Sequence, residues 1–492
     1  MKIKKVSFLV VFFMVASTLL ASPITSMEKR LYELCRINGA APPSSFSPWT
    51  PSELALSIPE EAGEGNAAHD MAVTAFSPSG KAFAWSIPIK MNLEFYFKSD
   101  DLYKWEDRLP VFELPMSFSF ADMVSFRSGF MMKLRRGLVP NGMPFATNLS
   151  NFSSLDDSDY FWPDRGFVQV NTSWFGLMAG RIPMHMGPGK TGSLLISNNV
   201  NYYDAILMKF FNRTFEFSTS VQFFPSEAEM GIGKRTFEIL IFHRFEFVVF
   251  RKARISVSES IMYSDEHFDL RYINPMLVYH QFFTEKLTNS MIAIDLDWNI
   301  IKGLGLYGQL AMDQYQLSAE DHETPDAFGY QIGLEYCTAL SKGNLSCWFE
   351  FTQTDPWLYH RDGIDYITWF RYREGYEKKY VGYPYGGDSQ VWALGIEYDN
   401  LEWLVFALSL SYVRKGEVGM NANFATDKNR ADRTPTGIPE NDLCLSLRFE
   451  AGPLYYLKFI GGFGLHYKTN FKHVTGCTDV NIQGNIGLSF QI

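Results

Sequence analysis

The feature that most constrains this chain is an alternation of apolar and polar side chains that recurs through its second half. In the segment 291–300, for example, apolar Ile294 and Trp298 alternate with Asp295 and Asp297. Successive side chains of a β-strand point to opposite sides, so a period of two indicates a strand with one apolar face. Because one segment after another repeats this pattern, the sequence predicts an all-β fold.

The connections between these segments indicate a particular kind of β-protein, because their lengths alternate. We predict nine strands in this half of the chain, at 291–300, 303–315, 327–339, 345–354, 390–398, 403–413, 441–450, 454–468 and 479–492. The short links lie at 301–302, 340–344, 399–402 and 451–453, and the long links at 316–326, 355–389, 414–440 and 469–478. Outer-membrane β-barrels have this asymmetry, with short periplasmic turns and long extracellular loops.

The same rule, followed toward the N-terminus, predicts nine further strands in the first half of the chain. They lie near 89–98, 111–119, 122–136, 165–172, 174–183, 202–211, 214–224, 235–247 and 253–263. The total is even, as a barrel with both ends on one side of the membrane requires. Lipid offers no hydrogen bonds, so the sheet must close and leave no edge unpaired. We therefore predict a transmembrane antiparallel β-barrel of about 18 strands.

In this barrel the apolar face of each strand touches lipid, and the face rich in Asp, Asn, Gln and Gly lines the interior. The alternative is a soluble sandwich that buries the apolar faces in its core. Aromatic residues make up 16% of the chain and no run of eighteen apolar residues follows position 22, which excludes disorder and helical membrane spans. A net charge of -10 makes nucleic acid a poor partner.

Residues 1–22 form a predicted export signal. Three lysines precede the apolar run from Val6 to Leu20, and the small residues Ala21 and Ser22 follow it. A membrane anchor is the alternative, but the run is shorter than the roughly 20 residues of a spanning helix. We therefore expect the signal to be cleaved and the protein to reach the outer membrane.

Residues 23–70 are predicted to form a small helical segment ahead of the barrel, which then occupies 71–492. A capping box at Thr25–Glu28 opens one amphipathic helix that ends at Gly39, and a second capping box begins at Thr50. The barrel topology places this segment in the periplasm. There it either plugs the lower mouth of the barrel or packs on it.

A Gly-rich segment and several shorter motifs are spread over most of the chain. They are Gly187-Pro-Gly-Lys-Thr-Gly-Ser-Leu-Leu-Ile-Ser-Asn-Asn199 preceded by Gly180-Arg181, then Arg271-Tyr-Ile-Asn-Pro275, Asp295-Leu-Asp-Trp298, Leu306-Tyr-Gly-Gln-Leu310 and Pro48-Trp49. Together these motifs resemble the Wzi-type capsule assembly family. The resemblance implies an eighteen-stranded outer-membrane barrel with a periplasmic helical bundle, acting as a lectin that holds capsular polysaccharide. One departure is the C-terminus, where Ile492 replaces a terminal aromatic residue.

The long link 355–389 holds the residues that we expect to contact a glycan. Flat aromatic faces suit the C–H groups of sugars, and arginine suits hydroxyls and uronate carboxylates. The candidates are Trp357, Tyr359, Arg361, Tyr366, Trp369, Arg371, Tyr372 and Arg373. Alternatively, the aromatic residues form a membrane-interface girdle, or the loop folds over the mouth and packs them inside.

A second candidate segment is the link 184–201, which we call the signature loop. Its candidate residues are Gly187, Pro188, Gly189, Gly192, Ser193, Asn198 and Asn199. The two asparagines suit sugar hydroxyls, but Gly, Pro and Asn are also ordinary turn residues, so we favour a structural clasp inside the barrel. The Gly-Lys-Thr at 189–191 lacks the glycine spacing and the following helix of a phosphate loop.

No motif indicates catalysis, a metal or a cofactor. The chain has neither HExxH nor GxSxG, and its five cysteines are scattered without a CxxC pair. His185, His280 and His360 fall on predicted outer loops. Cys337 and Cys347 flank one turn but point to opposite faces, so we expect no bridge between them.

These observations predict an outer-membrane protein that binds surface polysaccharide and supports capsule or exopolysaccharide assembly or attachment. Its expected partners are that capsular or exopolysaccharide and outer-membrane lipid, and its oligomeric state stays open. The alternative function is a passive porin, since eighteen strands enclose a wide lumen. The links 355–389 and 414–440 are long enough to cover the mouth, which favours a closed barrel.

Overall fold

The structure is a computed structural model of the whole chain. It describes residues 26–59, 71, 73, 80–97, 109–134, 145–149, 158–161, 166–234, 237–265, 270–274, 279, 288–314, 325–361, 364–372, 375–424, 433–454 and 456–492. The predicted export signal, the cap at Thr25 and His280 lie outside these residues.

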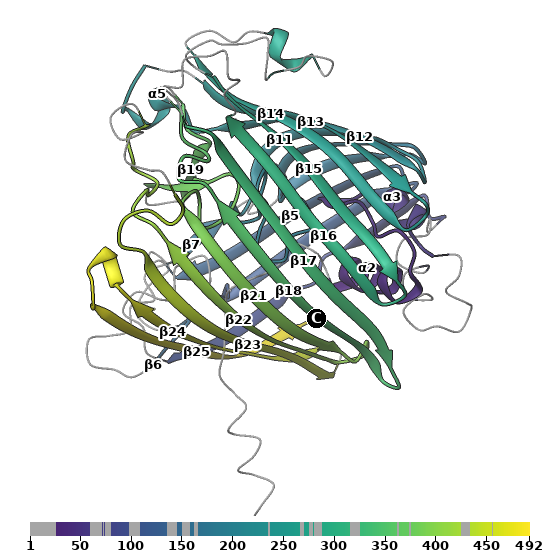
Figure 1. Ribbon diagram of the computed structural model, residues 1–492. Helices are drawn as coiled ribbons and strands as arrows, with labels where there is room; N and C mark the ends of the chain where they lie inside the picture. The colour runs from purple at the N-terminus through teal and green to yellow at the C-terminus, as the bar shows by residue number, and fades with distance from the viewer. Residues whose placement is uncertain are drawn as a thin grey trace, which may run out of the picture.

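The wall of the molecule is a closed antiparallel β-barrel (Figure 1). All eighteen predicted strands are confirmed, with edges that differ by up to a few residues. They are β3 (Lys90–Phe97), β4 (Phe112–Phe120), β5 (Val124–Leu134), β8 (Gly166–Asn171), β9 (Phe175–Ile182), β11 (Tyr203–Phe211), β12 (Phe215–Phe224), β13 (Phe237–Val249), β14 (Ala253–Asp265), β15 (Thr288–Ile301), β16 (Leu304–Gln314), β17 (Ala327–Leu340), β18 (Gly343–Thr354), β21 (Ser389–Asp399), β22 (Leu404–Lys415), β23 (Glu440–Leu454), β24 (Leu457–Thr469) and β25 (Thr478–Gln491). The barrel closes where β25 pairs with β3, from Gln491 opposite Lys90 to Gly484 opposite Phe97.

Three short strands that the sequence did not predict extend the barrel sheet. β2 (Phe83–Ser86) pairs with β4, β6 (Phe145–Thr147) with β3, and β7 (Ser158–Phe161) with β5. Each has four residues or fewer, which is too short for an alternation to be recognised.

The two faces of the strands have the predicted environments. On β17, Ile332 is 52% exposed on the outer wall, while its neighbour Gln331 is 3% exposed inside. β15 behaves in the same way, with Ile294 exposed and Asp295 buried. The apolar face of the barrel is therefore the face that meets lipid, and the polar face is enclosed. Among the described residues, no helix has both the length and the apolar character to cross a bilayer.

Two helices lie at the end of the barrel that carries the short turns (Figure 1). α2 (Ser26–Asn38) ends before Gly39, as predicted, and α3 (Pro51–Leu56) carries the predicted capping box. In that box the Glu53 amide donates to Thr50 Oγ1 at 3.1 Å, and the Thr50 amide donates to the Glu53 carboxylate at 3.3 Å. Arg36 of α2 is fully buried against inward-facing wall residues, so the helix is inserted in the mouth rather than packed on its rim.

An apolar core occupies the lumen between the two ends. Inward-facing residues of the wall, such as Leu207 and Phe242, contribute to it together with Phe46 of the N-terminal segment and Leu194 of the signature loop. Phe46 lies in β1 (Phe46–Ser47), which pairs with β10 (His185–Met186) of the signature loop. The N-terminal segment and the signature loop, which enter the barrel from opposite ends, therefore meet inside it. The protein's own chain occupies this part of the lumen.

The long-loop end carries four small elements. They are α5 (Glu227–Met230), the 3-10 helices η3 (Leu270–Ile273) and η5 (Phe471–His473), and a hairpin of β19 (Ile367–Tyr372) and β20 (Gly375–Tyr380). All five cysteines are free, and Cys337 pairs with Ser346 rather than with Cys347 in the ladder. The expectation of no bridge at this turn is confirmed.

Candidate functional site

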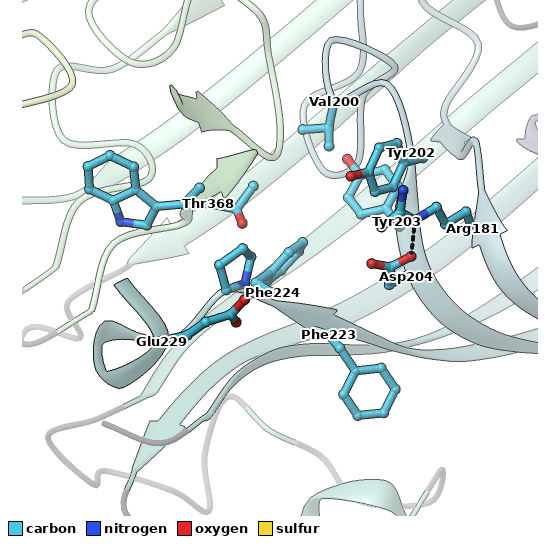
Figure 2. A pocket seen from close by; sticks show the side chains of 11 residues that line it. Arg181, Val200, Tyr202, Tyr203, Asp204, Phe223, Phe224, Glu229 and Thr368 are labelled. Carbon is cyan, nitrogen blue, oxygen red and sulfur yellow. Dashed lines mark hydrogen bonds and ion pairs between the residues drawn. The ribbon is translucent and has the colours of Figure 1, made fainter. Parts of the chain in front are cut away.

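A pocket of about 190 Å³ lies at the long-loop end of the barrel (Figure 2). It is bounded by the ends of β9, β11 and β12, by α5, and by the β19 strand that folds back from the link 355–389. Its lining residues are Arg181, Val200, Tyr202, Tyr203, Asp204, Phe223, Phe224, Pro225, Glu229, Thr368 and Trp369. Aromatic faces and planar polar groups are therefore gathered at one mouth of the barrel.

Arg181 and Asp204 form the polar side of the pocket. They lie opposite each other where β9 pairs with β11, and Arg181 Nε donates to Asp204 Oδ1 at 3.1 Å. The guanidinium also lies 4.4 Å from the centre of the Tyr202 ring. The two side chains are 30% and 49% exposed, so their pairing adds little stability and leaves polar atoms accessible to a ligand.

Trp369 forms the opposite side of the pocket and belongs to the predicted glycan-contacting set. It pairs with Lys378 in the β19–β20 hairpin, and Lys378 Nζ lies 5.2 Å from the indole centre. Thr368 beside it is buried, whereas Trp369 is half-buried. The hairpin thus brings two residues of the link 355–389, Thr368 and Trp369, to the end of the wall strand β12.

The structure places three other aromatic candidates of this link inside the molecule. Trp357, Tyr359 and Tyr366 are buried, and Tyr359 and Tyr366 are stacked with ring centres 6.0 Å apart. The Tyr359 hydroxyl donates to Leu194 O at 2.7 Å, which satisfies its polar end within the lumen core. These rings therefore stabilise the folded loop, as the internal-packing alternative predicts, and present no face to an outside sugar in this structure.

Among the arginine candidates, the structure describes the side chain of Arg361. The Arg361 amide donates to Asp365 Oδ1 at 3.3 Å, and Arg361 is half-buried. Arg371 and Tyr372 lie on β19, in register with Tyr376 and Gly375. Arg373 lies outside the described residues.

The signature loop lies inside the barrel, where wall residues hold it. The backbone amides of Lys190 and Thr191 donate to the Glu350 carboxylate at 2.6 and 2.9 Å. Gln309 accepts from the Leu194 amide at 2.5 Å and donates to Met186 O at 3.1 Å. Glu350 and Gln309 are fully or nearly fully buried. The loop is therefore a clasp between wall and lumen.

The remaining signature residues are consistent with this clasp. Gly192 has a φ of +140°, and a Cβ there would lie 2.4 Å from Pro384. Ser193 is fully buried, and its amide donates to Ser197 Oγ at 3.3 Å. The remaining glycines, Gly187 and Gly189, stand against Gln309 and Gln331, and Pro188 between them is buried. Asn199 donates to Tyr380 O at 2.8 Å, while Asn198 is half-buried beside it.

Sequence reasoning missed most of the pocket. Arg181 was noted only as part of a motif, and Tyr202, Asp204 and Glu229 were not singled out. The available signal was the run Tyr202-Tyr203-Asp204, which directly follows the signature loop and starts a predicted strand. Aromatic and acidic residues at the outer end of a barrel strand are placed at the mouth by topology alone. Within the described part of the chain, no group of three or more His, Cys, Asp and Glu side chains is arranged to hold a metal ion.

Fold and site together define an outer-membrane β-barrel with an apolar core in its lumen and an aromatic pocket at its long-loop mouth. The model of the family described as capsule assembly protein Wzi matches residues 93–452. The chain therefore belongs to the Wzi capsule assembly family, as its motifs suggested, and is an outer-membrane protein.

A solved structure shows the same architecture. The outer-membrane protein Wzi of Escherichia coli, described as a carbohydrate-binding β-barrel involved in group 1 capsule assembly, aligns with a TM-score of 0.61 at 15% identity, over 97% of this chain and 99% of that chain. OprD of Pseudomonas aeruginosa aligns with a TM-score of 0.45 at 11% identity, over 84% and 97% of the two chains, which carries no argument about function. A comparison with curated proteins gives no match.

Proposed function

We propose that this protein binds surface polysaccharide at its outer mouth and thereby supports the assembly or attachment of capsule or exopolysaccharide. The observation that carries the proposal is the pocket of Trp369, Tyr202, Arg181 and Asp204 at the long-loop end of a barrel with an occupied lumen. Membership of the capsule assembly family and the described carbohydrate binding of the Escherichia coli protein support it.

The chemistry of the pocket suits a sugar. Indole and phenol rings offer apolar faces to sugar C–H groups, and the charged pair offers both donors and acceptors to hydroxyls. The pocket volume of about 190 Å³ suits one sugar ring of a longer chain. The lining includes two carboxylates, Asp204 and Glu229, and one guanidinium, so we expect this pocket to prefer a neutral sugar. Uronate binding by Arg361, Arg371 and Arg373 remains a separate prediction. No catalysis is part of the proposal.

The proposal also includes an orientation of the barrel in the outer membrane. The end with α2 and α3 faces the periplasm, residues 23–70 lie on that side, and residues 1–22 are removed during export. The support is the position of both helices at the short-turn end, since short turns face the periplasm in outer-membrane barrels. Antibody or protease access to residues 355–389 on intact cells tests this orientation, and access only after the outer membrane is broken would reverse it.

Polysaccharide binding is tested with Trp369→Ala and a matched control, Trp174→Ala. Trp174 is exposed in the short turn between β8 and β9, at the opposite end of the barrel. We expect Trp369→Ala to weaken co-sedimentation with the host's polysaccharide by about tenfold, because a stacking residue contributes on the order of 1.4 kcal/mol or more. Trp174→Ala should bind normally. Equal binding by both variants, or no binding by the unchanged protein, would contradict the proposal.

A further inference from the structure

A cysteine, a histidine and an aspartate lie together on the inner face of the barrel, near the long-loop end. Asp442 and Cys444 belong to β23, and His466 belongs to β24, where it is the partner of Cys444 in the ladder. Leu443 and Tyr467, which flank them in sequence, are exposed on the outer wall. The three polar side chains therefore point toward the lumen, because alternate residues of a strand face opposite sides.

His466 connects the other two side chains. Its Nδ1 lies 2.9 Å from Asp442 Oδ2, and its Nε2 lies 3.5 Å from Cys444 Sγ. When Nδ1–H donates to the carboxylate, Nε2 is the nitrogen whose lone pair faces the thiol. A nucleophile, a base and a group that orients the base are the parts that activate a cysteine.

The surroundings allow a small reactant to approach. The side chains of His466 and Asp442 are 13% and 18% exposed, so solvent reaches the cluster. Tyr385 lies beside the cluster. The pKa of its hydroxyl is raised, mainly by burial and to a smaller extent by the nearby Cys444 and Asp442. Cys444 itself is only 7% exposed, which excludes a bulky reactant.

The backbone around Cys444 limits the chemistry. Cys444 pairs with His466 on one side and with Ser411 on the other, so its peptide groups belong to the sheet. Acyl transfer needs amide donors directed at a developing oxyanion, and the sheet leaves none beside this sulfur. Exchange between a thiol and a disulfide has no such requirement.

We propose that Cys444, His466 and Asp442 form a reactive-thiol site that takes up small thiols from their disulfides. The sulfur of Cys444 attacks one sulfur of a low-molecular-weight disulfide, R–S–S–R, while its proton passes to His466 Nε2. The S–S bond of the reagent breaks, a new S–S bond joins Cys444 to one R–S group, and the other leaves as thiolate. His466 returns the proton to that thiolate, which departs as R–SH.

The test uses the full chain in detergent micelles and the small neutral probe 2-hydroxyethyl disulfide, with peptide mapping by mass spectrometry. Cys477, which is exposed in the turn after η5, is the comparison within the same molecule. Cys444 should form the mixed disulfide faster than Cys477 despite its burial. His466→Asn should slow modification of Cys444 by about tenfold or more, because the base is lost, and leave Cys477 unchanged.

His473→Asn is the matched control, because His473 is an exposed histidine of η5 that bonds to Ile438 O. It should leave both rates unchanged. Asp442→Asn should also slow the modification of Cys444, and this variant replaces His466→Asn in the test if His466→Asn fails to fold. Three outcomes would overturn the proposal: Cys444 stays unmodified, it reacts no faster than Cys477, or its rate survives both the His466 and the Asp442 substitutions.

Discussion

At the scale of single residues, Glu350 shows how one wall side chain fixes a loop. Its buried carboxylate accepts from the amides of Lys190 and Thr191, from the Thr191 hydroxyl, and from Gln331 Nε2 at 3.0 Å. Amides inside a barrel have no water to bond with, so losing such an acceptor costs more than losing one at the surface. This carboxylate therefore contributes more hydrogen bonds to the loop segment 190–191 than a surface side chain could replace.

Glu350→Gln should destabilise the protein by about 2 kcal/mol, because the new amide turns one acceptor into a donor that faces backbone N–H groups. Denaturant unfolding and proteolysis within 184–201 measure the effect. The matched control is Glu450→Gln, whose exposed ion pair with Lys458 should contribute about 0.5 kcal/mol or less. If the two variants were equally stable, Glu350 would not hold the loop.

His185 gives a pH dependence. Burial lowers the pKa of its imidazole to about 4, below its ordinary value of 6.5. Above that ordinary value both folded and unfolded chains hold a neutral ring. As the pH falls toward the folded value, the unfolded chain binds a proton that the folded chain refuses, so the free energy of unfolding falls by at most about 3 kcal/mol.

His185→Asn should remove this part of the acid sensitivity, since asparagine does not titrate. Unfolding free energies at pH 7 and pH 4.5 for both proteins provide the measurement. An identical loss of stability in the variant would assign the acid sensitivity to other groups.

At the scale of elements, α2 is held in the barrel mouth by a buried arginine. Arg36 donates to Glu335 at 3.0 Å and to Asn299 at 2.6 Å, and it also pairs with Asp297. Lys190 of the signature loop donates to the other Glu335 oxygen at 2.6 Å. One wall carboxylate therefore ties α2 to a loop that enters from the opposite end of the barrel.

Arg36→Met should destabilise the protein by about 3–5 kcal/mol, because Asp297 stays buried without its cation and Glu335 keeps only Lys190. Thermal unfolding measures the loss, and protease cleavage within 26–38 reports release of the helix. Lys458→Met, which removes a cation from an exposed pair, should have almost no effect. Comparable unfolding temperatures for the two variants would show that packing alone retains α2.

The predictability of each element depended on its length and its environment. Wall strands such as β15 face lipid on one side and a polar lumen on the other, which imposes a period of two on the sequence. The α3 helix was predictable because Thr50 and Glu53 satisfy its free amides locally. The β19–β20 hairpin was missed because its two strands, Ile367–Tyr372 and Gly375–Tyr380, show no strict alternation of apolar and polar residues.

At the scale of the whole molecule, the lumen decides between a channel and a closed barrel. Eighteen strands alone enclose a water-filled pore. Here Phe46, Leu194 and Tyr359 join inward-facing wall residues in one apolar core, and α2 occupies the short-turn mouth. This core inside the wall favours the closed barrel over the porin alternative.

In planar bilayers the protein should therefore show no steady, porin-like current. Replacing residues 184–201 by a short Gly/Ser linker should produce one, since the clasp and its part of the core would be absent. An 18-stranded porin in the same bilayers is the positive control. A wide, steady current from the unchanged protein would contradict the occupied lumen.

The sequence by itself determined the wall of this protein: the number of strands, their faces and the closure of the sheet. Those properties follow from local constraints, because every strand meets the same two environments and repeats the same pattern. Only the tertiary structure decided what lies inside the wall. Whether Tyr359 and Trp369 face a sugar or a core depends on which distant wall residues they meet, as Tyr359 meets Leu194 and Trp369 reaches the end of β12. No local pattern predicts such contacts. Aromatic residues that pack in a core and aromatic residues that line a pocket have the same spacing in the sequence.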